Sequence, residues 1–317
     1  MIQAAPARSR SFRKGLRRLF LEPGGAEIAL EFSSVALVGA RVESKRGMAE
    51  LRAIASEPLT EGAFAPTLED PGFAGREEMR DAVKRVLSRV GAVPGARAAL
   101  VVPDVVARFR LFTPDEVGSE TRNREAVLAF RMQKLLPFAP ADVRVISAWP
   151  RSASGPVLGI GFSAAVVGAY EQVGRAFGLD VGSVETSSMA LLRGFSVDGD
   201  ALLVRHDPSW LAVTLVRDGW PISIRILDAT VAGSPAEARR EIASTAVFWR
   251  DRLGGERLTA AFVHASDPWF ESLGAEVASE FGCVAQRAQP PASLAVAGLP
   301  TATLRSATPA LALLEAR

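Results

Sequence analysis

The chain contains few of the side chains that most often catalyse reactions or bind metal ions. Among its 317 residues it has one cysteine and two histidines. The single cysteine, Cys283, excludes an intramolecular disulfide and a metal cluster held by several thiolates of this chain, and it favours a reducing compartment. The sequence has no Gly-x-Ser-x-Gly, His-Glu-x-x-His, Walker-type or Rossmann motif. It therefore lacks the standard signatures of serine hydrolases, metalloproteases and dinucleotide-binding enzymes.

Long apolar runs and an excess of one charge are also missing. No run of about 18 uninterrupted apolar residues occurs, as a membrane-crossing helix would need, and the basic N-terminus lacks the apolar core of a signal peptide. The chain has 37 basic and 35 acidic residues, so it has no broad basic field for nucleic acid. We expect a protein that is neither secreted nor membrane-spanning and that does not bind nucleic acid.

The middle of the chain has the clearest secondary-structure pattern. Residues 122–136 predict a helix whose cations lie opposite a buried stripe, and Pro137 ends it. The predicted stripe, with Phe130 beside it, consists of Leu128, Met132, Leu135 and Leu136. Residues 97–178 as a whole alternate as strand, strand, helix, strand, strand, helix, which predicts one small α+β layer pair. Because 317 residues with 48% hydrophobic content favour two domains, this unit interrupts a larger architecture.

The flanking sequence predicts further strands and helices around this unit. The strongest local signals are a Ser234–Pro235 helix start and an Asp218–Gly219 hairpin. The expected strands are two within 27–42, then 50–56, 200–205, two within 210–227, and 259–264. The expected helices are 76–90, 235–253, 268–281 and 310–316, and residues 57–75 are expected to form a surface loop.

The first residues form a basic segment with an apolar side. At helical spacing, its apolar side consists of Phe12, Leu16, Leu19 and Phe20, and its flanks carry Arg13, Lys14, Arg17 and Arg18. A short helix of this kind can lie on an anionic membrane surface. The alternative is a solvated, disordered tail, because Gly15 weakens helix formation by up to about 1 kcal/mol.

Several of these stretches resemble PilM-type proteins of type IV pilus assembly. The resemblance is carried by Pro103–Asp104, Thr113–Glu116, the Lys134–Phe138 helix end, Asp142, Gly178–Leu179, Ser188–Leu191, Val216–Gly219 and residues 310–317. It implies an α/β, two-lobed actin-like (ribonuclease H-like) fold with an inserted α+β subdomain. It divides the chain into a tail over 1–25, a first lobe over 26–182 with the insertion at about 97–178, and a second lobe over 183–317 whose C-terminal helix returns to the first.

The same resemblance implies two phosphate-binding loops and an adenosine loop, but this sequence departs from the pattern in each. Where the family has an acidic residue, a glycine and then a lysine, this chain has Glu31, Ser33 and Val38, with Ser34 in the same loop. The second loop has Arg205, His206, Asp207 and Pro208, so an arginine replaces the metal-binding acid and a proline removes an amide. The third loop follows the predicted strand with His264 and Ser266 and has no glycine. We therefore expect no cofactor, with ATP and magnesium possible only under a shifted alignment.

Three functions compete. The resemblance implies a non-catalytic cytoplasmic scaffold, peripheral to the inner membrane, that binds the tail of a bitopic PilN-like protein and possibly other platform proteins. One alternative is an ATP-binding actin-like protein whose nucleotide state regulates pilus or type II secretion assembly. Another is a soluble equivalent of the cytoplasmic actin-like domain of the secretion platform protein GspL. The histidines of the degenerate loops, each near an aspartate, also leave open a divalent metal site, although turn histidines are usually only polar surface groups.

The resemblance places a partner-binding groove between the inserted unit and the first lobe. The edge of the groove is expected at the strands around 100–102 and 108–112, where Arg108, Arg110 and Phe112 lie, with Arg131 on the neighbouring helix. An extended peptide gains backbone hydrogen bonds from a free strand edge, and arginines favour an acidic or carbonyl-rich tail. The alternative for each arginine is an ordinary solvated surface charge.

We predict that residues 1–22 help to recruit the protein to anionic membranes. Each cation near the surface contributes about 1 kcal/mol, and this attraction weakens as salt rises. In liposome sedimentation, the full chain should bind more than a truncation that starts at Ala26. Equal sedimentation of the two proteins would contradict the prediction.

Overall fold

A computed structural model describes residues 25–45, 48–118, 123–150, 152, 155–194, 197–290, 294 and 301–314. The predicted basic segment, from Phe12 to Phe20, lies outside these residues. Within the described ranges, none of the helices is both long and apolar enough to cross a membrane.

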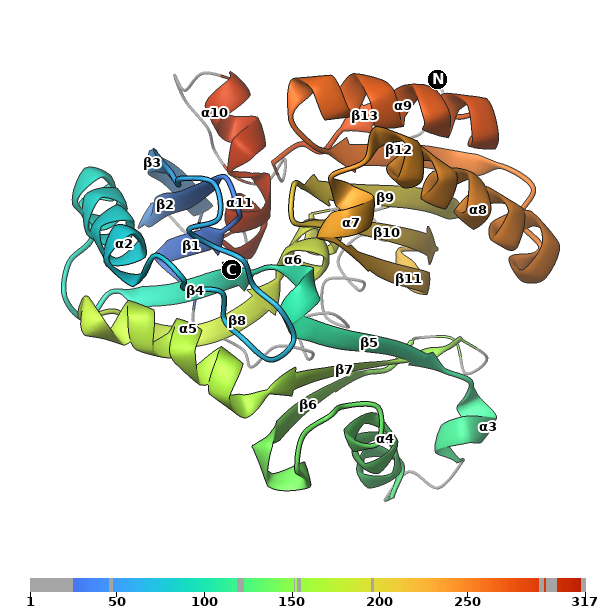
Figure 1. Ribbon diagram of the computed structural model, residues 1–317, viewed down its shortest axis with the longest axis horizontal. Helices are drawn as coiled ribbons and strands as arrows, with labels where there is room; N and C mark the ends of the chain where they lie inside the picture. Colours follow the sequence, from blue (N-terminus) through green and yellow to red (C-terminus); the bar gives the residue numbers. More distant parts are fainter. Residues whose placement is uncertain are drawn as a thin grey trace, which may run out of the picture.

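Two five-stranded sheets with the same strand order form the body of the molecule (Figure 1). In each sheet three consecutive antiparallel strands are followed by two parallel strands. The first sheet is ordered β3 (Met48–Pro58), β2 (Ala36–Lys45), β1 (Ile28–Phe32), β4 (Arg97–Val102) and β8 (Asp180–Thr186). The second is ordered β11 (Trp220–Asp228), β10 (Trp210–Arg217), β9 (Asp200–Asp207), β12 (Leu258–His264) and β13 (Ala285–Arg287).

Helices cover the faces of these sheets and divide the core. The apolar sides of α2 (Arg76–Val90) and α5 (Ala164–Ala176) pack on one face of the first sheet, and α11 (Thr308–Leu314) packs on the other. In the second sheet, α8 (Pro235–Leu253) and α9 (Asp267–Phe281) pack together on one face. Shorter helices connect these parts: α6 (Ser187–Arg193), α7 (Ala229–Ala232) and α10 (Thr301–Ser306).

A third, antiparallel sheet is inserted after β4. It is ordered β5 (Ala107–Phe112), β7 (Val157–Ser163) and β6 (Val143–Ala148), and α4 (Arg124–Gln133) packs on one face. The connections are η2 (Asp104–Val106), α3 (Pro114–Val117) and η3 (Pro140–Asp142). Gly159 and Gly161 on β7 permit the close approach of α4 and the turn after it, because a Cβ at these positions would lie 2.8 Å from Met132 Sδ and 2.6 Å from Leu136 Cδ1.

Local signals in the sequence predicted several elements correctly. The helices expected at 76–90 and 235–253 are α2 and α8, and the Ser234 hydroxyl accepts a hydrogen bond from the Glu237 amide at 3.4 Å. The Asp218–Gly219 hairpin is also confirmed, with φ angles of 51° and 74° that suit a tight β-hairpin turn. These features depend on residues close in sequence, which explains why pattern and capping chemistry were sufficient.

The predicted insertion at 97–178 was too wide. The strand expected at its start is β4, a buried central strand between β1 and β8, so residues 100–102 form no free edge. At its end, α5 packs on β4 and β8 of the first sheet. The chain leaves the first sheet at Pro103 through η2, so the local break that suggested a hairpin in fact separates two sheets. The expected boundary at 182/183 falls inside β8.

Other expectations missed elements with weak local signals. No element was predicted for β8, α6, β13 or α10. The buried stripe of α4 was also overextended: Leu135 follows the end of the helix and is 39% exposed, while Leu128 and Met132 are fully buried. The helix ends at Gln133, so helical spacing no longer determines the direction of the next side chain.

Candidate functional site

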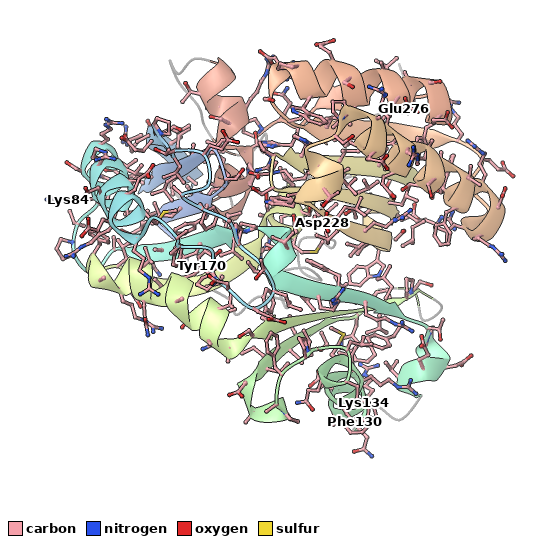
Figure 2. The ribbon with its side chains drawn as sticks, viewed as in Figure 1. Lys84, Phe130, Lys134, Tyr170, Asp228 and Glu276 are labelled. Atoms are coloured by element: carbon pink, nitrogen blue, oxygen red, sulfur yellow. The ribbon has the colours of Figure 1, made fainter. Side chains whose placement is uncertain are left out.

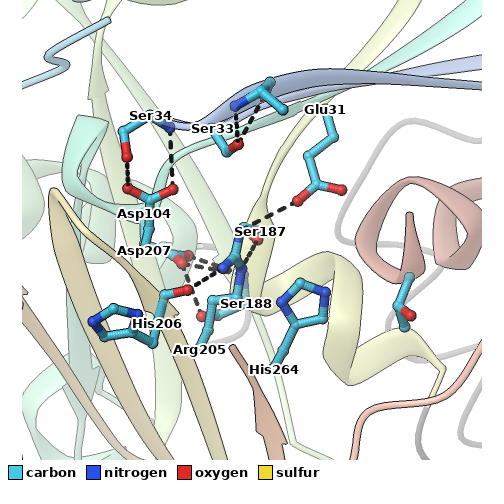
Figure 3. Close-up of polar contacts among 12 residues, drawn as sticks. Glu31, Ser33, Ser34, Asp104, Ser187, Ser188, Arg205, His206, Asp207 and His264 are labelled. Carbon is cyan, nitrogen blue, oxygen red and sulfur yellow. Dashed lines mark hydrogen bonds and ion pairs between the residues drawn. The ribbon is translucent and has the colours of Figure 1, made fainter. Parts of the chain in front are cut away.

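The three predicted nucleotide loops meet at one cleft of about 410 Å³. They are the β1–β2 turn, the β9–β10 turn and the end of β12. The first two correspond in position because the two sheets share one strand order, in which β1 matches β9. The predicted residues that line the cleft are Glu31, Ser33, Val38, Arg205, His206, Asp207, Pro208, His264 and Ser266. Ser34, in the β1–β2 turn, contacts Asp207, at the end of β9 (Figure 3). Arg287 on β13 and Arg305 on α10 also line the cleft, and the sequence did not single them out.

An ion pair between the sheets occupies the centre of this region. Arg205 Nη2 on β9 lies 3.3 Å from Glu31 Oε1 on β1, and the side chains are 6% and 2% exposed. The Arg205 Nε donates a hydrogen bond to Ser187 Oγ at 3.1 Å, and the guanidinium lies 4.9 Å from the centre of the Trp210 ring. Arginine cannot bind a divalent cation, since it has five donors and no acceptor.

Burial dominates the titration of Glu31. Desolvation raises the pKa of its carboxyl group to about 7, although the nearby Arg205 acts in the opposite direction. A backbone hydrogen bond from Ala310 also acts against this rise in pKa. Glu31 therefore changes charge near neutral pH, which makes the ion pair sensitive to the protonation of this carboxyl group.

A second polar contact joins the same two turns. The Ser34 amide donates a hydrogen bond to Asp207 Oδ2 at 3.1 Å, and the Ser34 hydroxyl bonds to Asp207 Oδ1. Asp207 also accepts a hydrogen bond from the Ser209 amide at 3.0 Å. The Asp207 carboxylate is thus already satisfied by groups of the two turns, and the neighbouring Pro208 has no amide hydrogen to offer.

The two histidines have separate environments. His206 Nε2 lies 2.9 Å from the Ala232 carbonyl oxygen, and its ring stacks on Trp269 with 3.8 Å between ring centres. His264 Nε2 lies 3.0 Å from the Arg305 carbonyl oxygen. Burial lowers the pKa of both imidazoles, that of His264 to about 3. Within the described ranges, no group of three His, Cys, Asp or Glu side chains is arranged to hold a metal ion.

Sequence reasoning missed a buried polar cluster next to the cleft. Asp104 Oδ2 accepts a 2.8 Å hydrogen bond from Ser188 Oγ, and the Ser188 amide donates to the same carboxylate. Burial raises the pKa of Asp104 to about 6. On β8, Glu185 is buried near Arg193, with 3.4 Å between Glu185 Oε1 and Arg193 Nε. No periodic pattern indicated these residues, because Asp104 lies in the short turn η2 and Glu185 near the end of β8, where long-range packing decides which side chains are buried.

The predicted partner-binding residues lie on one side of the inserted sheet but differ in exposure. Arg108, Arg110 and Arg131 are exposed, and Arg110 Nη2 lies 3.1 Å from Glu116 Oε1. Phe112 is buried under α4, so the expectation that it faces a partner was wrong. An alternating strand places every second residue on one face, but it does not show whether a helix covers that face.

Comparison with solved structures identifies the architecture. A chain of the PilM–PilN type IV pilus biogenesis complex matches with a TM-score of 0.73 and 17% identity, covering 93% of this chain and 98% of that one. A Bacteroides thetaiotaomicron protein of unknown function with an actin-like ATPase fold matches with a TM-score of 0.50 and 8% identity, covering 81% and 89%. The cytoplasmic domain of EpsL, an inner-membrane component of the Vibrio cholerae type II secretion system, matches at 0.49 and 9% identity, covering 88% and 92%. No family model matches the chain, and no curated protein matches it significantly.

The protein thus has an actin-like α/β fold of two lobes, each built on one five-stranded sheet, with an inserted three-stranded unit. The expected fold class is confirmed. The resemblance to PilM-type proteins is also confirmed at the level of the fold, over nearly the full length of both chains.

The titration of Glu185 gives a prediction about stability. Burial raises the pKa of its carboxyl group from 4.5 to about 7, so between these values the folded state retains a proton that the unfolded state has lost. Rising pH therefore lowers the free energy of unfolding across this window. Glutamine at this position does not titrate, so Glu185→Gln does not lose stability in this way. The free energy of unfolding of the variant minus that of the wild type should therefore increase by about 2 kcal/mol from pH 5 to pH 8.

Urea unfolding at both pH values measures this difference. Glu61→Gln, at an exposed position, is the control for the substitution itself. A pH-independent difference between Glu185→Gln and wild type would contradict the assigned role of burial.

Proposed function

We propose that this protein is a non-catalytic, cytoplasmic scaffold of a type IV pilus assembly platform that holds the cytoplasmic tail of a bitopic inner-membrane protein. The observation that carries the proposal is the match to a chain of the PilM–PilN complex, which includes 98% of that chain. A PilN-like protein is the partner that this comparison favours. Other platform proteins are further candidates for the same scaffold.

The cleft supports a scaffold over an ATP-dependent role. Actin-like folds suggest ATP with magnesium, and this combination needs backbone amides for phosphate and carboxylates for the metal. Here Arg205 pairs with Glu31 at the centre of the cleft, Asp207 binds Ser34, and Pro208 lacks an amide hydrogen. These residues do not fit a magnesium-bound triphosphate, because binding would require breaking the buried ion pair and placing phosphate beside Asp207.

The alternative is an ATP-binding protein whose nucleotide state regulates assembly. In its favour, a cleft of about 410 Å³ remains between the loops, and Glu31 retains a carboxyl group. A direct measurement of MgATP binding distinguishes the two functions.

We predict that MgATP does not bind measurably. A ligand that binds only the folded state raises its stability in proportion to RT ln(1 + [L]/Kd), so millimolar MgATP should leave the unfolding temperature unchanged from that in magnesium alone. Thermal unfolding and titration calorimetry provide two independent readings. A saturable shift would reject the scaffold assignment in favour of the ATP-binding alternative.

We also predict that the partner tail binds beside the exposed arginines of β5. Arg108 and Arg110 can attract an acidic or carbonyl-rich peptide through charge-assisted hydrogen bonds. Arg108→Glu with Arg110→Glu should weaken binding of a PilN-like cytoplasmic peptide by about tenfold or more, measured by fluorescence anisotropy.

A matched control is Arg240→Glu on α8, whose side chain is 71% exposed. This variant should bind the peptide as the wild type does. Unchanged affinity of the β5 variant, or hydrogen-exchange protection confined to residues after 183, would place the tail elsewhere.

A further inference from the structure

The outer side of α4 and the turn after it expose apolar side chains. Phe130 is 57% exposed and Leu135 is 39% exposed. Figure 2 shows Phe130 and Lys134 at the lower extreme of the molecule, directed away from the inserted sheet. The opposite side of the helix carries Leu128 and Met132, which are fully buried against that sheet. We call Phe130, Arg131, Lys134 and Leu135 the α4 crest.

The charges of the α4 crest have one sign. Between Glu125 and Asp142 the sequence contains no acidic residue, and its only charged residues are Arg131 and Lys134. Both side chains are exposed, and Lys134 Nζ lies 4.3 Å from the centre of the Phe130 ring. An aromatic ring beside cations, with no anion between them, is complementary to the interface of an anionic lipid surface.

Another exposed apolar pair within the described residues lacks this character. Val247 and Phe248 on α8 are 48% and 41% exposed, but Arg250, Asp251 and Arg252 lie shortly after them in the same helix. Charges of both signs reduce the attraction to an anionic surface. This pair therefore serves as a matched reference for exposed hydrophobicity alone.

The size of the α4 crest favours a membrane over a protein partner. A stable protein interface buries roughly 800 Å² on each partner, which two partly exposed apolar side chains do not provide. Membrane association instead adds several weak contacts, each too weak to anchor a protein alone. The basic segment at residues 10–20, for which we predict membrane binding above, would add a second contact of the same chemistry.

We propose that the α4 crest is a membrane-contact site for anionic phospholipid, with Phe130 and Leu135 entering the interface and Arg131 and Lys134 facing the headgroups. This orientation rests on the proposed function in one respect: a unit that holds a short tail emerging from the membrane must lie close to it. Long cationic side chains can extend along an apolar surface while their charges remain in water, which suits Lys134 beside Phe130.

The experiment is sedimentation of the full chain with vesicles of phosphatidylglycerol and phosphatidylethanolamine, without any partner peptide. Phe130→Ser with Lys134→Glu should weaken vesicle binding at least about fivefold, the factor that corresponds to about 1 kcal/mol for one cation near the surface. The control Phe248→Ser should bind as the wild type does. Repeating the comparison in the truncation that starts at Ala26 separates the α4 crest from the basic segment.

Three results would overturn the proposal. The first is vesicle binding by the crest variant that equals that of the wild type. The second is an equal loss of vesicle binding in the crest variant and in Phe248→Ser. The third is binding of the wild type to phosphatidylcholine vesicles that equals its binding to the anionic vesicles. Because all these side chains are exposed, unfolding temperatures should not change. If the double variant does not fold, Lys134→Glu alone gives the same test through charge.

Peptide binding distinguishes this proposal from the proposed function. The crest variant should still bind the PilN-like peptide in solution, since Arg108 and Arg110 are intact. Loss of peptide binding with normal vesicle binding would reassign the α4 crest to the protein partner and overturn the membrane assignment. If the Arg108→Glu, Arg110→Glu variant bound the peptide as tightly as the wild type, that result would count against the proposed function and leave the membrane proposal intact.

Discussion

The buried ion pair between Glu31 and Arg205 is the central contact between the two sheets at the cleft. It joins β1 of the first sheet to β9 of the second, and both side chains are almost completely excluded from solvent. Removing one partner of such a pair would leave an uncompensated buried charge, which is typically far more destabilising than the pair is stabilising. The contact therefore constrains substitution at both positions together, and it places a buried cation at the centre of the cleft.

The repeated strand order explains why this pair forms at all. Each sheet begins with antiparallel strands whose first turn points into the cleft, so the ends of β1 and β9 face one another. The contact between Ser34 and Asp207 has the same origin, because those residues occupy the two turns. Folding of each lobe places these residues at its own turn, and the docking of the two sheets then brings together residues more than 170 positions apart in sequence.

The sequence was most informative where structure depends on neighbouring residues. The helices α2 and α8 carry their apolar stripes and caps within their own segments, so their bounds were predictable. The resemblance located the loops that converge on the cleft, but the pairing of Arg205 with Glu31 depends on how the sheets meet. The sequence also did not predict that β4 belongs to the first sheet, because long-range packing decides which strands are neighbours. Phe130 and Leu135 could not be classed as exposed, because hydrophobicity predicts burial only where another element is present to cover the side chain.

The turn at Pro103–Val106 has a mechanical consequence. It is the point where the chain passes from the first sheet into the inserted unit, and Asp104 within it is hydrogen-bonded to Ser188 on α6. The neighbouring residue of α6, Ser187, accepts the hydrogen bond from Arg205. A displacement of the inserted unit at this turn would therefore move a residue bonded to α6, which is itself bonded to Arg205 of the second lobe.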